Sequence, residues 1–273
     1  MTDHSPNPTR LDDWWSAFFD DAYAAYGLAN EPPDVTRHVV DFLMQMLELR
    51  DGQTVLDQCC GIGRLSIPLA QRGVKVIGIE QAESYVTVAR RRSVEMDLPC
   101  EFHQGDALTF VAPRPCDAAF NWFTSFGYHE DDSMNAKMLA RAFASLKPGG
   151  RFVLDYLHLP RVFAEFKQVH VDRPAAADLQ GLIVIQETEP DFLTGMMNSR
   201  WTFLYPDGRR IERHIRTRML LPSDFVRMFR TAGFEDVKLF GWVTGEPHTR
   251  LSRRCIVMGC KPERPPASRT PGH

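Results

Sequence analysis

The sequence predicts an α/β fold in which a parallel β-sheet carries helices on both faces. Between residues 54 and 157, five short runs of β-branched and aliphatic residues alternate with segments of helical periodicity. A glycine turn directly follows the first of these runs. Polar side chains stand at the carboxyl ends of four predicted strands, where ligands bind in such sheets: Asp57, Glu80, Asp106 and Asn121.

The first strand, residues 54–57, is too short for a helix and ends at Asp57. Gly61 and Gly63 follow, and both allow positive φ and place no Cβ atom between the backbone and a ligand. We expect a helix to begin there, with its first N–H groups and the positive end of its dipole facing the same point. This segment therefore predicts a ligand-binding turn at the carboxyl edge of the sheet.

The second strand, residues 75–80, ends in Glu80, and a carboxylate at this point suits the two hydroxyls of a ribose. Dinucleotide-binding folds have a third glycine where this chain has Ser66. The pattern Gly61-x-Gly63-x-x-Ser66 therefore favours a nucleoside without a pyrophosphate, and it argues against a nicotinamide-dependent oxidoreductase.

The rest of the parallel sheet is expected at residues 101–107, 117–121 and 151–157, with helices at 35–49, 84–96 and 131–146. The third strand ends in Asp106, whose carboxylate can accept a hydrogen bond from the exocyclic amine of an adenine. Aromatic and small hydroxyl residues fill 122–129 after the fourth strand, which is typical of a wall for a cationic or aromatic ligand.

After residue 160 the pattern changes to strands without long helices between them, at 169–172, 181–188, 199–204 and 211–220. We expect an antiparallel insertion over the parallel sheet, with a hairpin turn at Tyr205-Pro206-Asp207-Gly208. A helix at 222–232 and strands at 237–242 and 255–260 then complete a seven-stranded sheet.

The N-terminal segment, residues 11–26, is expected to be one helix unusually rich in aromatic residues. Its rings either pack on the domain or form a cover over the ligand, with Trp14, Phe19, Tyr23 or Tyr26 facing it. The expected organisation is a disordered start at 1–10, covering helices at 11–50, a core at 51–160 and 221–261, the insertion at 161–220 and a disordered tail at 262–273.

Composition excludes several other classes of protein. With 44% hydrophobic and 25% charged residues and a net charge of −3 over 273 residues, the chain lacks the basic balance of a nucleic-acid-binding protein. No apolar run approaches the roughly twenty residues that span a bilayer, and no signal peptide is visible, so we expect a cytoplasmic protein without a membrane partner. The six cysteines are expected to be reduced and structural, no metal is expected, and a homodimer is left open.

With these motifs in view, residues 11–261 resemble the class I S-adenosylmethionine-dependent methyltransferases. The resemblance rests on the segment 55–64, the acid Glu80, Gly105-Asp106-Ala107 and the turn Leu146-Lys147-Pro148-Gly149-Gly150. Thr124-Ser125-Phe126-Gly127-Tyr128 is similar to a signature of a bacterial small-molecule subset that includes N-methyltransferases. The resemblance implies the strand order 3-2-1-4-5-7-6, with the last strand antiparallel, and an antiparallel lid sheet.

The resemblance also implies a site for S-adenosyl-L-methionine, whose product is S-adenosyl-L-homocysteine. By position, Gly61 and Gly63 lie against the methionine moiety, Asp57 and the Asn121 carbonyl hold its ammonium group, and Glu80 binds the ribose hydroxyls. Asp106 and Ala107 bracket the adenine. The remaining expected cofactor contacts are Cys60, Gln81, Phe123 and Tyr26.

Methyl transfer from a sulfonium is an in-line displacement, so a neutral, aligned amine needs little beyond positioning. A hydroxyl acceptor also needs a base, for which His129 is the first candidate and Tyr128 the second. Each residue also has an alternative without a chemical role: His129 as a loop histidine, and Tyr128 as an aromatic residue that only packs. Expected acceptor contacts are Trp14, Phe126, Tyr156 and Arg218, although Arg218 equally suits a structural ion pair.

The sequence therefore favours N-methylation of a small molecule over O-methylation. Enzymes that methylate base amines present Asn/Asp-Pro-Pro-aromatic after the fourth strand, whereas this chain has Asn121-Trp122-Phe123-Thr124. A protein that binds S-adenosylmethionine without catalysis is a further alternative.

Overall fold

The computed structural model describes residues 14–263. The predicted disordered start at 1–10 lies outside this range, as does the predicted tail beyond residue 263. The main sheet of the described part has seven strands in the order β3-β2-β1-β4-β5-β11-β10. All neighbours are parallel except β11, which runs antiparallel to both β5 and β10. The predicted order and the antiparallel last strand are confirmed. The strands are β1 (Thr54–Gln58), β2 (Lys75–Glu80), β3 (Cys100–Gln104), β4 (Cys116–Asn121), β5 (Leu146–Leu157), β10 (Glu235–Phe240) and β11 (Arg254–Cys260).

Helices cover both faces of this sheet because successive strand residues point to opposite sides. Val55 of β1 packs in the cluster under α3 (Pro33–Met46) and α4 (Ser66–Ala70), whereas Leu56 packs in the cluster under α6 (Asp132–Ser145) and α8 (Pro222–Thr231). α5 (Glu83–Glu95) packs beside β3 and α4.

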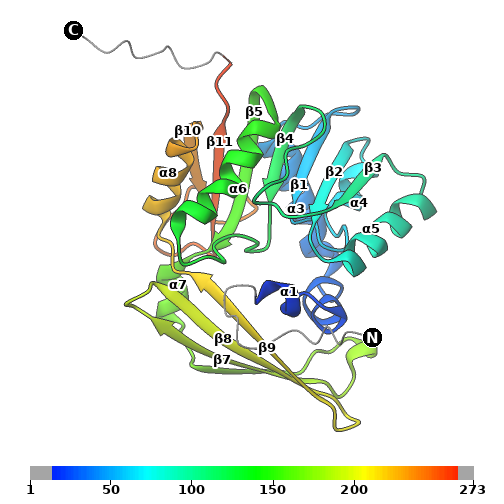
Figure 1. Ribbon diagram of the computed structural model, residues 1–273, viewed down its shortest axis with the longest axis vertical. Helices are drawn as coiled ribbons and strands as arrows, with labels where there is room; N and C mark the ends of the chain where they lie inside the picture. The colour runs from blue at the N-terminus through cyan, green and yellow to red at the C-terminus, as the bar shows by residue number, and fades with distance from the viewer. Residues whose placement is uncertain (1–13, 264–273) are drawn as a thin grey trace, which may run out of the picture.

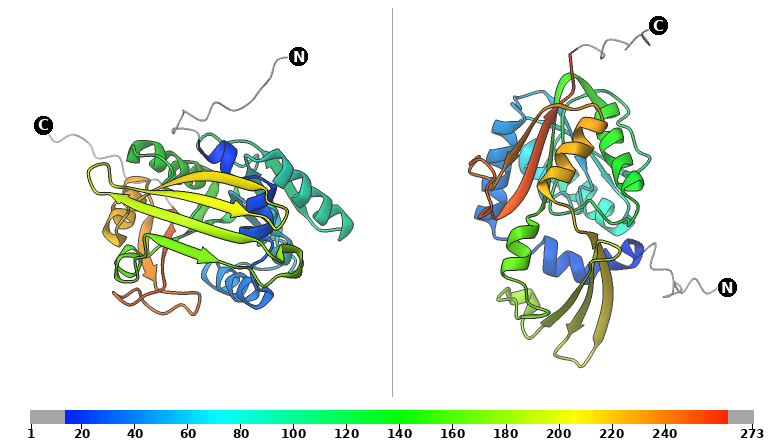
Figure 2. Two further views of the ribbon diagram at one scale, coloured as in Figure 1. Left: turned by 90° about the horizontal axis from the view of Figure 1, so that it is seen from below. Right: turned by 90° about the vertical axis from the view of Figure 1, so that its left-hand side faces the viewer.

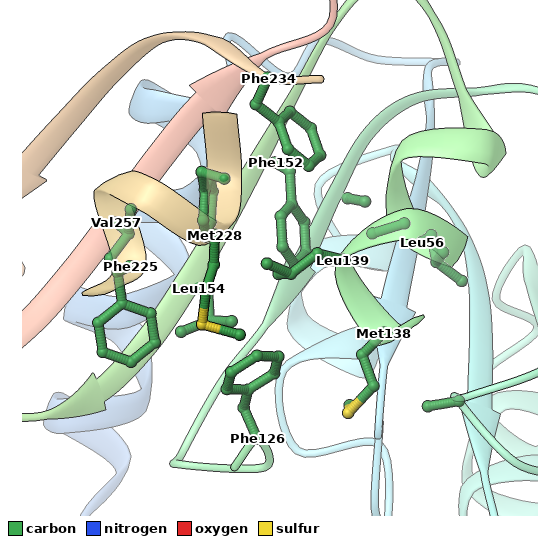
Figure 3. Close-up of a cluster of buried hydrophobic side chains, with 14 of the residues drawn as sticks. Leu56, Phe126, Met138, Leu139, Phe152, Leu154, Phe225, Met228, Phe234 and Val257 are labelled. Carbon is green, nitrogen blue, oxygen red and sulfur yellow. The ribbon is translucent and has the colours of Figure 1, made fainter. Parts of the chain in front are cut away.

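The cluster on the α6 and α8 side contains many aromatic residues (Figure 3). The ring of Phe152 on β5 stacks on Phe229 of α8 at 5.6 Å between centroids and on Phe234 at 5.6 Å. Burying one such side chain contributes about 1.5–3 kcal/mol, so this face anchors β5 and β11 firmly against the helices. Both strands carry residues that bond to the loop beside the site described below.

A second, antiparallel sheet has the order β6-β7-β8-β9 and is called the lid sheet here. Its strands are β6 (Val169–Asp172), β7 (Ile183–Asp191), β8 (Met196–Leu204) and β9 (Arg210–Arg218), and α7 (Leu159–Ala164) leads into it from β5. The predicted hairpin turn closes with a 2.9 Å hydrogen bond from the Tyr205 N–H to the Arg209 carbonyl. Figure 1 shows the lid sheet below the main sheet, with the N-terminal segment between them, and the right-hand view of Figure 2 agrees.

The N-terminal segment differs from the single predicted helix. It folds as α1 (Trp15–Phe18), α2 (Asp21–Tyr23) and a π-helix (Ala24–Leu28). The chain breaks at Asp20, which is extended (φ −114°, ψ −177°) and caps α2 by accepting the Tyr23 N–H at 3.0 Å. Asp is a favoured N-cap residue, and this signal overrides the helical periodicity across it.

Two other boundaries also differ from the sequence-based expectations. α4 has only five residues and begins at Ser66, so a run of turn residues separates the glycines from it, and the expected contribution of a long helix dipole is lost. β5 begins at Leu146 rather than 151, because the 147–150 segment is itself paired: the Gly149 N–H donates to the Lys261 carbonyl at 2.9 Å.

Candidate active site

A cavity opens at the carboxyl ends of β1, β2 and β4, between the main sheet and the N-terminal segment. It holds about 1060 Å³ of space free of protein atoms, part of it open to solvent. Ten of the predicted site residues line it: Asp57, Cys60, Gly61, Glu80, Gln81, Asp106, Ala107, Phe123, Tyr128 and His129. The strand ends predicted from the sequence thus meet at one place.

Glu80 is 8% exposed, and both of its carboxylate oxygens accept backbone hydrogen bonds. Oε2 accepts from the Gly61 N–H at 3.0 Å, and Oε1 accepts from Gln81 at 2.8 Å and Ala82 at 3.0 Å. Burial raises the pKa of Glu80, and these three donors oppose that effect. Because a carboxylate has about four lone-pair sites, Glu80 keeps acceptor capacity for a ligand hydroxyl.

Asp57, on β1, is 3% exposed, and its Oδ2 accepts a 2.6 Å hydrogen bond from the Ser66 hydroxyl. Burial raises the pKa of Asp57 to about 7, against the lowering effects of this hydrogen bond and of Arg64. Ser66 occupies the position of the third glycine of dinucleotide-binding folds. Its side chain holds the carboxylate that faces the cavity, an arrangement that a glycine would not provide.

The two glycines of the turn have different surroundings. Gly61 (φ +56°) lines the cavity, where a Cβ atom would lie 3.4 Å from the Leu28 side chain. Gly63 (φ +76°) lies outside the cavity lining and packs inward, since a Cβ atom there would meet Ala89 at 3.3 Å and Phe102 at 3.4 Å. Gly63 therefore allows the turn to pack on α5 and β3, and its predicted contact with the ligand is not supported by the packing.

At the β3 end, Asp106 is exposed at the cavity, and its Oδ1 accepts from the Leu108 N–H at 2.8 Å. This bond orients the carboxylate and leaves Oδ2 to a ligand. Ala107 is 9% exposed and lines the same wall. Asn121, at the end of β4, is fully buried and outside the lining; its Nδ2 donates to the Ser125 carbonyl at 3.0 Å. Its side chain therefore shapes the loop after β4.

Tyr128 and His129 line the cavity beside the N-terminal aromatic residues. The ring of Tyr128 lies 4.8 Å from that of Trp14, and the ring of His129 lies 4.7 Å from that of Trp15. Burial raises the pKa of the Tyr128 hydroxyl well above its ordinary value. The His129 backbone is held by Asn135, which accepts its N–H at 3.2 Å and donates to its carbonyl at 2.8 Å.

The four predicted acceptor contacts lie outside the cavity lining. Phe126 and Tyr156 are fully buried in the main core, and the Tyr156 hydroxyl donates to the Arg218 carbonyl at 2.6 Å. Arg218 pairs with Asp132 (Nε to Oδ1, 2.9 Å), so it forms the structural ion pair rather than an anion site. Trp14, 6% exposed, supports the Tyr128 ring from behind.

Tyr26, predicted to contact the cofactor, also lies elsewhere. Its hydroxyl donates to Asp172 Oδ2 of the lid sheet at 2.8 Å. It lines a second hollow between the N-terminal segment and the lid sheet, which is called the lid hollow here. The residues of the lid hollow are Tyr23, Tyr26, Gly27, Asn30, Glu31, Phe123, Asp172 and Trp201. Tyr23 and Phe123 line both spaces, so the two are adjacent.

Several cavity residues had not been assigned a site role from the sequence. They are Trp15, Leu28, Cys59, Ile62, Arg64, Leu65, Ile79, Tyr85, Gly105, Leu108, Trp122, Ser125 and Met138. Arg64 gave a signal, since it directly follows the glycine motif. Its guanidinium lies 5.3 Å from the centroid of the Phe123 ring, and its Nη1 donates to the Thr36 hydroxyl at 3.1 Å. Cys59, Ile62, Gly105, Trp122 and Ser125 also lie within the motifs or the aromatic segment 122–129 noted in the sequence, whereas the rest reach the cavity through packing.

Within residues 14–263, no group of three or more His, Cys, Asp or Glu side chains could hold a metal ion. None of the helices described is long and apolar enough to cross a membrane.

Comparison with known proteins agrees with this site. Residues 55–150 match the family model described as a methyltransferase domain. This part of the chain therefore resembles a methyltransferase domain, and the fold around it is shared with solved methyltransferase structures.

The S-adenosyl-L-methionine-dependent Diels-Alderase iccD of Talaromyces variabilis is 32% identical over 123 residues. The match covers 43% of this chain and 41% of that protein, so the chain spans less than half of this relative. Two solved structures have the same fold over most of their length. The CcbJ methyltransferase from Streptomyces caelestis has a TM-score of 0.71 at 20% identity, covering 86% of this chain and 92% of that one. The sugar N-methyltransferase KedS8 from Streptoalloteichus has a TM-score of 0.64 at 19% identity, covering 96% and 98%.

Proposed function

We propose that this protein transfers the methyl group of S-adenosyl-L-methionine to an amine nitrogen of a small molecule. The amine is favoured as acceptor because of the lid hollow. This hollow adjoins the cavity, and the carboxylates of Glu31 and Asp172 line it together with aromatic rings. The proposed acceptor is a molecule with a basic amine next to a flat or apolar part.

The cavity residues fit the cofactor by their charge. Burial raises the pKa of the Asp57 carboxyl despite the opposing effect of Arg64, and an ammonium group at the cavity would favour its charged form. Glu80 has acceptor capacity for hydroxyls, and Asp106 has a carboxylate oxygen for an exocyclic amine. When bound, the cofactor supplies a methyl group on a sulfonium, whose thioether leaves without further activation.

The lid hollow supplies the recognition of a cationic acceptor. Glu31 and Asp172 form no salt bridge within residues 14–263. Asp172 accepts the Tyr26 hydroxyl and the Arg173 N–H, and Glu31 acts electrostatically on Arg64, so both place negative charge at the hollow. The rings of Tyr23, Trp201 and Phe123 line the same hollow, and aromatic faces attract ammonium groups. An amine is held there in its charged form and must lose a proton before it attacks.

The chain's own contribution to the reaction is then mainly positioning and exclusion of water. Aromatic residues of the N-terminal segment line the cavity, and Phe123 and Tyr23 line both spaces. Positioning of this kind is sufficient for an amine. Tyr128 is a poor base because burial disfavours its phenolate, so we assign His129, which also lines the cavity, as the base for an acceptor that must lose a proton.

The test is a methylation assay with paired acceptors, each amine matched by the alcohol of the same skeleton, followed by mass spectrometry of the product. We expect amines to be methylated and the paired alcohols to be at least tenfold slower. Asp172→Asn and Glu31→Gln should each raise the KM for the amine by about two- to fivefold, as expected for partly exposed charge pairs.

Glu189→Gln, an exposed acid of β7 outside the hollow, is the matched control and should leave that KM unaltered. Preferred methylation of the alcohols, with strong loss in His129→Ala, would instead support O-methylation with His129 as the base. Tight binding of S-adenosylhomocysteine without transfer to any acceptor would support the non-catalytic alternative.

A further inference from the structure

The loop after β4 has an unusual backbone. Phe123 (φ +66°) and Thr124 (φ +61°) both lie in the left-handed region, although neither is glycine. Two consecutive residues of this kind are strained, and such strain persists only where the surroundings hold the chain in place. Phe123 is also the ring shared by the cavity and the lid hollow.

A buried ion pair holds this loop from the side of the main sheet. Asp155 on β5 has a side chain only 3% exposed, and Arg254, the first residue of β11, pairs with it twice: Nε to Oδ1 at 2.7 Å and Nη2 to Oδ2 at 2.7 Å. The two strands are hydrogen-bonded neighbours inside the sheet, between β4 and the edge strand β10 (Figure 1), so the pair is built on rigid elements.

Both partners of the ion pair bond directly to the strained residues. Asp155 Oδ2 accepts the Phe123 N–H at 3.0 Å, and Arg254 Nη2 donates to the Thr124 hydroxyl at 2.6 Å. The loop is closed on its other side by Asn121, whose Nδ2 donates to the Ser125 carbonyl. The strained peptides are therefore fixed at both of the residues with positive φ.

The ring that this arrangement orients is 38% exposed, which is high for a phenylalanine and consistent with a surface that a ligand covers. Its face is directed at Arg64, which lies 5.3 Å away at the mouth of the glycine turn. A rotation of the Phe123 backbone would move the ring out of the wall between the two spaces.

We propose that Asp155 and Arg254 are positioning residues, which hold the Phe123–Thr124 backbone in its strained form so that the Phe123 ring forms the wall of the cofactor cavity on the acceptor side. The inference rests on the cofactor site of the proposed function and extends it to residues outside the cavity lining. Neither residue contacts the cavity itself.

The test replaces the ion pair with apolar side chains, in Asp155→Leu/Arg254→Met, and measures the Kd for S-adenosylhomocysteine by isothermal titration calorimetry. Both charges are removed together because a single substitution would leave one buried charge without a partner. Exchanging a buried pair for apolar residues often preserves global stability, which urea unfolding checks in parallel. We expect the unfolding midpoint to be kept or raised and the Kd to rise about tenfold.

The same double substitution is then made together with Thr124→Gly, since glycine adopts positive φ without strain. We expect the triple variant to have a Kd no more than about threefold higher than that of Thr124→Gly alone. Asp117→Asn is the matched control. That carboxylate also accepts a backbone N–H (Thr54, 2.8 Å) and pairs with a cation (Lys147, 2.6 Å), but it lies at the far end of β4, so its loss should leave the Kd unaltered.

Wild-type affinity in Asp155→Leu/Arg254→Met would overturn the inference, as would an equal loss of affinity in the wild-type and the Thr124→Gly backgrounds. Because these measurements use only S-adenosylhomocysteine, they stand whether or not an amine acceptor is methylated. Failure of the proposed acceptor is therefore distinguishable from failure of the positioning role.

Discussion

Asp57→Asn should stabilise the ligand-free protein at alkaline pH while weakening its cofactor site. The carboxyl is buried against Ser66, and its pKa is about 7 in the folded protein against an ordinary value of 3.8. The folded state therefore holds the proton more tightly than the unfolded state. Ionisation of Asp57 costs stability progressively as pH rises above 3.8, and the full cost is reached above pH 7.

The magnitude follows from this difference in pKa. About three pH units at about 1.4 kcal/mol each give a cost near 4 kcal/mol when Asp57 is fully ionised. About 3 kcal/mol of this develops between roughly pH 5 and pH 8.5. The asparagine of the variant does not ionise, and its amide oxygen can still accept the Ser66 hydroxyl. Its unpaired NH₂ group costs about 1–3 kcal/mol at either pH, so the variant should gain about 3 kcal/mol on the wild type between pH 5 and about pH 8.5 and be the more stable protein at the higher pH.

Urea unfolding at the two pH values measures the difference in the free energy of unfolding between wild type and variant. The titration of all other groups is common to the two proteins and cancels in this difference. Parallel stability profiles, with a constant gap between wild type and variant, would refute the raised pKa and the burial that causes it. The same variant should bind S-adenosylhomocysteine more weakly, since it lacks the charge that faces an ammonium group.

Two other substitutions test the cofactor site and its cover. Glu80→Gln should raise the Kd for S-adenosylhomocysteine by about 10- to 100-fold, because an amide replaces a carboxylate oxygen that faces the Gly61 N–H; an unaltered Kd by calorimetry would remove Glu80 from the site. Arg213→Met should detach the N-terminal segment from the lid sheet by breaking its 2.6 Å pair with Asp20, changing global stability by less than about 1 kcal/mol but accelerating hydrogen exchange of the segment. Arg210→Met, which breaks an exposed pair on the same strand, is its control; equal exchange in both variants would contradict the anchoring role.

The pattern of residues along the chain was enough to predict the main sheet and to bring several polar strand-end residues together at one cavity. Alternating strands and helices specify a parallel sheet because few topologies bury such a pattern, and the carboxyl ends of its strands necessarily meet along one edge. Asp57, Glu80 and Asp106 could therefore be assigned to one cavity without knowledge of any side-chain contact. The order of the strands was implied by the family resemblance, and the structure shows the same order.

Which aromatic and charged residues face that cavity depends on how the whole chain packs. Trp15 and Phe19 line it, whereas Trp14 lies outside the lining and packs its ring against both of theirs. Phe126, Tyr156 and Arg218 take part in packing and an ion pair, and nothing in their local sequence distinguishes this from a contact with substrate. Residues 155 and 254 meet across 99 positions to hold the strained loop at Phe123. Patterns of neighbouring residues report local conformation and the burial of a face, whereas a contact between distant segments exists only once those faces have packed.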